Sequence, residues 1–95
     1  MSENKIKHFE TLWEEAEKLS SGMYKDMPTD ELIKFVNDLL TGYSEASQIE
    51  SKEISDSLKN KQIGEIVFIL TALSLRDNIN VYAALQEQCV LRNIG

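Results

Sequence analysis

Residues 61–93 carry the sequence KQIGEIVFILTALSLRDNINVYAALQEQCVLRN, which decides the fold. Apolar side chains recur in its first part at intervals of three and four residues, the spacing that places them on one face of an α-helix. These residues are Ile63, Ile66, Val67, Leu70 and Leu73. Further apolar residues widen this face, so a helix over 61–76 needs cover on most of its sides.

A polar corner, Arg76–Asn80, follows this helix and separates it from a second one. Asn78 and Asn80 are both suited to begin the second helix, because a short polar side chain can accept a hydrogen bond from a free backbone N–H. Beyond the corner lies another apolar stripe, made of Val81, Ala84, Leu85 and either Cys89 or Val90. The sequence therefore predicts a pair of helices in residues 61–93.

Two more helices are expected earlier in the chain. The apolar face of the first consists of Ile6, Phe9, Leu12, Trp13, Ala16 and Leu19. We expect Ser20-Ser21-Gly22 to end it, because serine is a poor helix-interior residue and glycine is favoured just beyond a terminus. Pro28 disfavours helical geometry in the residue before it, so the next helix is expected to begin near Thr29, with Thr29 as its cap.

The pattern is weakest in residues 44–61, where apolar side chains are spread thinly among polar ones. Ser47 followed by Glu50 matches a capping box, so a helix can begin there and continue through 61–76 as one long rod. The alternative is that part of 43–60 forms a loop. Together, these segments predict an all-α protein: a single domain over 1–95, folded as a compact bundle of about four helices.

The composition narrows the classes of function. Sixteen acidic and ten basic residues give a formal net charge of -6, which disfavours nucleic-acid binding because phosphate contacts rely on Lys and Arg. The longest uninterrupted apolar run is too short to span a bilayer, so no membrane association is expected. The polar N-terminal residues and the single cysteine, Cys89, indicate a cytoplasmic protein in a reducing compartment.

A chain of 95 residues can form only a small hydrophobic core. Such a domain removes only roughly 60–65% of its unfolded surface from water. A partner subunit would add buried apolar area. We therefore expect a homodimer or higher homo-oligomer that associates through the apolar helix 61–76.

Residues 62–85 contain four features in order: Gln62-Ile63-Gly64-Glu65, an apolar run, the Asn-rich corner and Val81-Tyr82-Ala83-Ala84-Leu85. Together they resemble the second half of the MazG-like all-α NTP pyrophosphohydrolases. In that family, a helix carrying Glu-x-x-Asp leads into an apolar run, a turn and an amphipathic helix. Its members hydrolyse a nucleoside triphosphate between the α- and β-phosphates, with Mg²⁺ held by carboxylates of neighbouring helices. The resemblance covers roughly the last third of the chain and implies Mg²⁺ and a nucleoside triphosphate as ligands.

Transferred to this chain, the family's metal site implies Glu65, Asp38, Glu14 and Glu17 as candidate Mg²⁺ ligands. Glu65 falls at the Asp of Glu-x-x-Asp, whereas Gln62 stands at its Glu position and carries no charge. The upstream Glu-x-x-Glu of the family has two candidate equivalents. One is the pair Glu14 and Glu17 in the first helix, and the other is Asp38 in the second. The set of carboxylates is incomplete, although a hard divalent cation needs several oxygen ligands.

Near the end of the chain, the family's Lys and Asn imply Arg92 and Asn93 as candidates for binding the substrate. Asn93 agrees with the family pattern, whereas Arg92 is only the nearest cation. The resemblance thus implies a degenerate MazG-like nucleotide-binding protein, at most a weak Mg²⁺-dependent pyrophosphohydrolase. The competing hypothesis is a non-enzymatic acidic helical module that binds another protein.

Overall fold

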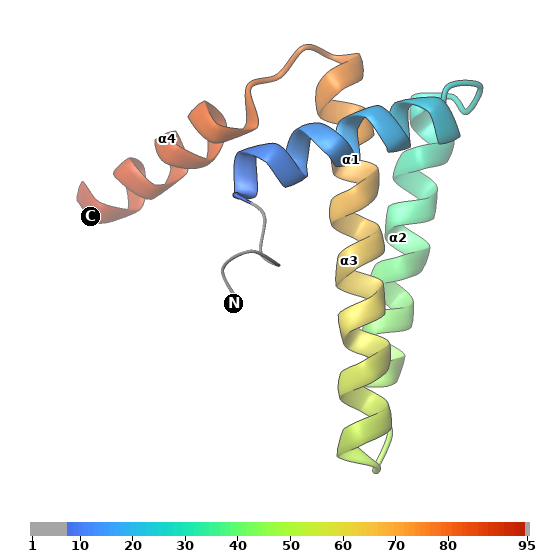
Figure 1. Ribbon diagram of the computed structural model, residues 1–95. Coiled ribbons are helices and arrows are strands. Elements are labelled where there is room, and N and C mark those ends of the chain that lie inside the picture. Colours follow the sequence, from blue (N-terminus) through green and yellow to red (C-terminus); the bar gives the residue numbers. More distant parts are fainter. Residues whose placement is uncertain (1–7, 95) are drawn as a thin grey trace, which may run out of the picture.

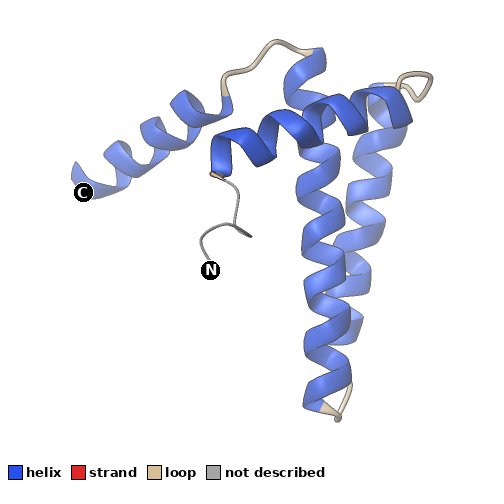
Figure 2. Ribbon diagram, in the orientation of Figure 1, coloured by secondary structure: helices blue, strands red, loops and turns tan. Residues whose placement is uncertain are grey.

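The computed structural model describes residues 8–94, and these contain four α-helices (Figure 1). The helices are α1 (Phe9–Met23), α2 (Thr29–Ala46), α3 (Lys52–Arg76) and α4 (Val81–Ile94). Short loops connect them, and the described part of the chain contains no strand (Figure 2). The prediction of an all-α protein with four helices is confirmed.

The long helix α3 is the centre of the packing. It runs antiparallel to α2 at its side, while α1 crosses the pair near the C-terminal end of α3 (Figure 1). The buried core lies between these helices and consists of Tyr24, Leu32, Leu39, Ile66, Ile69 and Ala72. Among these, Leu32 and Ile69 are fully buried. The hydrophobic period in the sequence marks this face only in part: Ile66 lies in the core, whereas Ile63, Val67 and Leu70 of the same predicted face are exposed.

Residues 52–76 form one uninterrupted helix, so the long-rod alternative for the weak segment is correct. Its cap is Ser51, whose hydroxyl accepts a 3.4 Å hydrogen bond from the backbone N–H of Ile54. Ser47, which the capping-box pattern selects, instead follows the end of α2, and its hydroxyl donates to the Tyr43 carbonyl at 3.1 Å. The prediction was wrong about the cap because residues 47–51 form the turn between the two helices.

The predicted end of α1 was also wrong, because the helix continues through Ser20-Ser21-Gly22 to Met23. Ser20 is buried, and its hydroxyl lies 2.7 Å from the hydroxyl of Thr71 on α3, so this serine joins two helices instead of ending one. The Ser21 hydroxyl donates to the Lys18 carbonyl one turn earlier, at 3.2 Å. Ile6, which the pattern assigns to the same helix, lies outside the described residues.

α2 begins at Thr29 as predicted, but Thr29 does not cap it. The cap position is Pro28, which makes no side-chain bond. The Thr29 hydroxyl instead accepts a 3.1 Å hydrogen bond from the Arg76 guanidinium, which also donates to the Tyr24 carbonyl at 3.0 Å. Through these two hydrogen bonds, Arg76 links the C-terminal end of α3 to the connection between α1 and α2.

The corner before α4 uses its two asparagines differently. Asn80 is the cap, since its side-chain oxygen accepts a 3.0 Å hydrogen bond from the Ala83 backbone N–H. Asn78 adopts a positive φ of 56°, a conformation that asparagine tolerates better than most residues. The axis of α4 turns by 109° from that of α3, and α4 projects from the three packed helices (Figure 1).

Within residues 8–94, no single helix has the length and apolarity to cross a membrane, although α3 and α4 together have both as a bent pair.

Candidate functional site

α1 carries an apolar stripe that the other described helices leave largely exposed. Trp13 and Ser20, on one side of α1, are buried against α3. The stripe lies beside them and consists of Phe9, Leu12, Leu19 and Met23, whose side chains are 48–70% exposed. Because α1 lies across the α2–α3 pair, only part of its circumference can contact them.

A second uncovered stripe runs along α3, in the helix that the sequence predicts as an oligomer contact. It consists of Ile63, Val67 and Leu70, which are spaced by four and three residues and are 37–46% exposed. The neighbouring positions Ile66 and Ile69 are buried in the core. α1 and α2 thus cover two sides of α3 and leave a third apolar side open. We call the α1 and α3 stripes together the apolar face.

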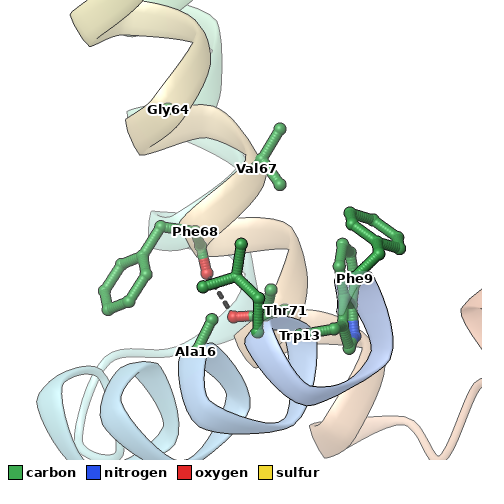
Figure 3. Close-up of a pocket in the computed structure, with 8 residues that line it drawn as sticks. Phe9, Trp13, Ala16, Gly64, Val67, Phe68 and Thr71 are labelled. Carbon is green, nitrogen blue, oxygen red and sulfur yellow. Dashed lines mark hydrogen bonds between the residues drawn. The ribbon is translucent and has the colours of Figure 1, made fainter. Parts of the chain in front are cut away.

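A hollow of about 200 Å³ lies between the two stripes. Its walls come from Phe9, Leu12, Trp13 and Ala16 on α1 and from Gly64 and Val67 on α3 (Figure 3). A Cβ at Gly64 would meet no heavy atom within 4 Å, so the missing side chain leaves open space. A cavity of about 150 Å³ already accommodates a benzene molecule. The hollow can therefore hold a large apolar side chain.

The one hydroxyl in the lining is not available to a ligand. Thr71 donates a 2.6 Å hydrogen bond to the Phe68 carbonyl, drawn as the dashed line in Figure 3, and its oxygen also lies 2.7 Å from the Ser20 hydroxyl. Both bonds hold the hydroxyl within the protein. The hollow accordingly presents an apolar lining with no titratable side chain among its residues.

A second, more polar hollow of about 440 Å³ lies between α1 and the corner that precedes α4. Glu14 and Glu17, two of the four predicted metal ligands, line it together with Asn78, Asn80 and Tyr82. The Tyr82 hydroxyl is shielded from solvent and has no hydrogen-bond partner. Burial, followed by the carboxylates of Glu10, Glu14 and Glu17, raises the pKa of Tyr82. The structure therefore brings the α1 carboxylates close to α4.

The other two predicted ligands lie elsewhere. Asp38 lines a different, shallow hollow on α2, beside Glu31 and Lys34. Glu65 is partly buried on α3 and lies close enough to Tyr24 to influence its pKa. Among residues 8–94, no three His, Cys, Asp or Glu side chains gather in a group that could hold a metal ion. The assignment of Mg²⁺ ligands stays a prediction.

The predicted substrate-binding residues Arg92 and Asn93 are exposed near the end of α4. The Arg92 guanidinium donates a hydrogen bond to the Gln88 side chain one turn earlier. Because Tyr82 marks the start of the same helix, Arg92 lies about 15 Å further along the axis than the hollow of Glu14. The structure does not place the two sets of candidates together.

Compared with family models, curated proteins and solved structures, the chain matches none. The similarity to the MazG-like family therefore stays a prediction from the pattern of residues 62–87.

The hollow beside Gly64 was not predicted from the sequence. An isolated glycine inside an apolar helix was the available signal, since such a glycine often has a packing or functional reason.

Tyr24, in the core below this site, makes the stability depend on pH. Burial and, to a smaller extent, the Glu65 carboxylate raise its pKa above the ordinary 10.0. Because the folded state holds this proton more tightly, the stabilisation is complete below about pH 10 and is lost as the pH rises through the folded pKa. We expect thermal melts of Tyr24→Phe to lose less stability than the parent as the pH rises above 10.0. Parallel losses in the two proteins would contradict this assignment.

Proposed function

We propose that this protein is a non-enzymatic, acidic helical module that binds another protein chain through its apolar face, and that it self-associates there. The supporting observation is the apolar hollow between α1 and α3, flanked on both sides by exposed apolar stripes. Contiguous apolar patches on a protein surface commonly mark sites of protein contact.

The surface area of the chain supports a partner. The chain exposes 7476 Å², whereas a compact monomer of 10.8 kDa exposes roughly 5,500 Å². The eight residues outside the described range can account for at most about 1,300 Å² of the difference, which leaves a surplus of about 700 Å². A stable interface buries about 800 Å² on each partner. The surplus is therefore of the size that one interface would bury.

A charge placed in the apolar face tests the proposal. Val67→Glu puts a carboxylate at the edge of the hollow, and burying it unpaired against a partner would be costly. We expect sedimentation equilibrium to show that Val67→Glu weakens self-association at least about tenfold, since central contacts dominate an interface. Ser57→Glu adds the same charge to an exposed polar position of α3 and is expected to associate like the parent. Equal association of all three proteins would refute a role for the apolar face.

Binding of a Mg²⁺–nucleoside triphosphate is a second candidate function, and the polar hollow favours it. Glu14, Glu17, Asn78 and Asn80 line that hollow, and their side-chain oxygens are of the type that Mg²⁺ prefers. In that case we expect a nucleoside triphosphate to raise the melting temperature only with Mg²⁺, and Glu17→Gln to abolish the rise. Glu65→Ala and Asp38→Ala test the two predicted ligands that lie elsewhere in the same way. If neither Mg²⁺ nor the nucleotide changes the melting temperature, this second candidate function is wrong.

A further inference from the structure

α4 lacks an apolar surface to pack against. None of its described side chains is buried, and Leu85, Val90 and Leu91 are 51–57% exposed. A helix of 14 residues is only marginally stable in water without tertiary packing. The helix therefore needs contact with another surface.

Within residues 8–94, its own chain packs against α4 at the first turn alone. There the rings of Tyr82 and Phe9 meet edge to face, with centroids 6.0 Å apart. Beyond this point α4 leads away from α3, from which its axis turns by 109° (Figure 1). Leu85 and the residues after it thus extend away from the hollow beside Gly64 in the same molecule.

We infer that α4 of one copy docks on the apolar face of a second copy, with Leu85 inserted into the hollow beside Gly64, and that the exchange is reciprocal. This inference rests on the proposed self-association and names the surfaces that meet. Leu85 is the large member of a stripe with Val81 and Cys89, one turn to either side. The hollow of about 200 Å³ can take such a side chain. This exchange would fill the hollow and would cover the exposed apolar side of α4 in each copy.

The charges allow α4 to approach α1. α1 carries an excess of acid: Glu10, Glu14, Glu15 and Glu17 against Lys18. Two copies of a chain with a net charge of -6 repel each other. α4 carries Glu87 and Arg92 as its charged side chains and is therefore neutral. It can contact α1 without bringing further negative charge.

A reciprocal exchange also agrees with the size of the exposed surface. Each copy would contribute one helix and one face, so the same two surfaces would be buried twice around a two-fold axis. Such an arrangement closes as a dimer and fills the hollow beside Gly64 in both copies. The surplus of about 700 Å² in each copy is close to the area of about 800 Å² that a standard interface buries on each partner.

Two full-length variants test the two halves of the contact by sedimentation equilibrium. Gly64→Phe fills the hollow from α3, where a new side chain meets open space, so the monomer should still fold. Leu85→Glu places a charge on the side of α4 that would enter the hollow. We expect each change to raise the dimer dissociation constant at least about tenfold. The matched controls are Gly64→Ala, which leaves most of the hollow open, and Gln86→Glu, which adds charge beside Leu85; both are expected to stay within about twofold of the parent.

A mixture of the two variants decides whether the contact is an exchange. Gly64→Phe still offers an intact α4, and Leu85→Glu still offers an open hollow, so together they retain one complete contact. We expect the equimolar mixture to form heterodimers more tightly than either variant forms homodimers, by about tenfold. This gain distinguishes the exchange from a symmetric contact between two apolar faces, which the mixture would not restore.

The outcomes separate this inference from the proposed function. A parent dimer that neither variant weakens, or that the mixture fails to restore, would overturn the docking of α4 while self-association stands. A parent that is monomeric at every concentration would overturn both. A monomer whose melting temperature falls with both variants, as followed by circular dichroism, would show that α4 packs into the hollow of its own chain and would also overturn the exchange.

Discussion

Replacing Ile69 by alanine is expected to lower the free energy of unfolding by about 3–4 kcal/mol. Ile69 is fully buried in the core between α2 and α3. The change removes buried apolar surface and leaves a cavity, and such substitutions in well-packed cores cost about 2–5 kcal/mol. A small single domain is stable by only about 5–15 kcal/mol, so this is a large fraction of the total. Urea denaturation followed by circular dichroism measures the loss.

The matched control is Ile54→Ala, which deletes the same atoms from the same helix. Ile54 is 54% exposed near the start of α3, so its side chain contributes less to the core. We expect this variant to lose less than about 1 kcal/mol. If the two substitutions cost the same, the packing of α3 against α2 along Ile69 would be wrong.

The second large effect is expected from Thr71→Val. Ser20 and Thr71 are buried, with their hydroxyl oxygens 2.7 Å apart, and Thr71 donates to the Phe68 carbonyl at 2.6 Å. Ser20 is therefore the donor between the two hydroxyls. Valine has nearly the shape of threonine but cannot accept this bond, so a buried hydroxyl is left with only the Glu17 carbonyl, 3.4 Å away. We expect a loss of about 1–3 kcal/mol in unfolding free energy.

A double-mutant cycle identifies the origin of this loss. Removing both hydroxyls, in Ser20→Ala/Thr71→Val, leaves no unsatisfied donor from Ser20. The double variant is therefore expected to be more stable than the sum of the two single effects predicts, by about 1 kcal/mol. Additive single effects would show that the two hydroxyls do not form the bond that joins α1 to α3.

Much of the fold was predictable because hydrophobic period and local capping act over short distances in the sequence. The period of residues 61–76 identified a helix, and Pro28 located the start of α2 at Thr29. The end of α1 was missed because the preference of serine for helix ends was overridden by a contact 51 residues away, the bond between Ser20 and Thr71. No local pattern contains that information.

The candidate site was predictable only in part. The structure leaves the stripe of Ile63, Val67 and Leu70 exposed, so the expectation that a partner subunit covers helix 61–76 stays a prediction. The hollow beside it depends on how α1 crosses α3 and on the absence of a side chain at Gly64, which is a tertiary property. The candidate carboxylates came from a family resemblance, and the structure places only Glu14 and Glu17 at one hollow.

The molar mass of the unmodified chain in solution tests the central claim most directly, because a monomer would leave the apolar face in water. Light scattering during size-exclusion chromatography, over a range of protein concentrations, gives this mass without a calibration of shape. Self-association predicts a mass of at least twice the 10.8 kDa of one chain, approached as the concentration rises. A constant mass of 10.8 kDa across the range would contradict it.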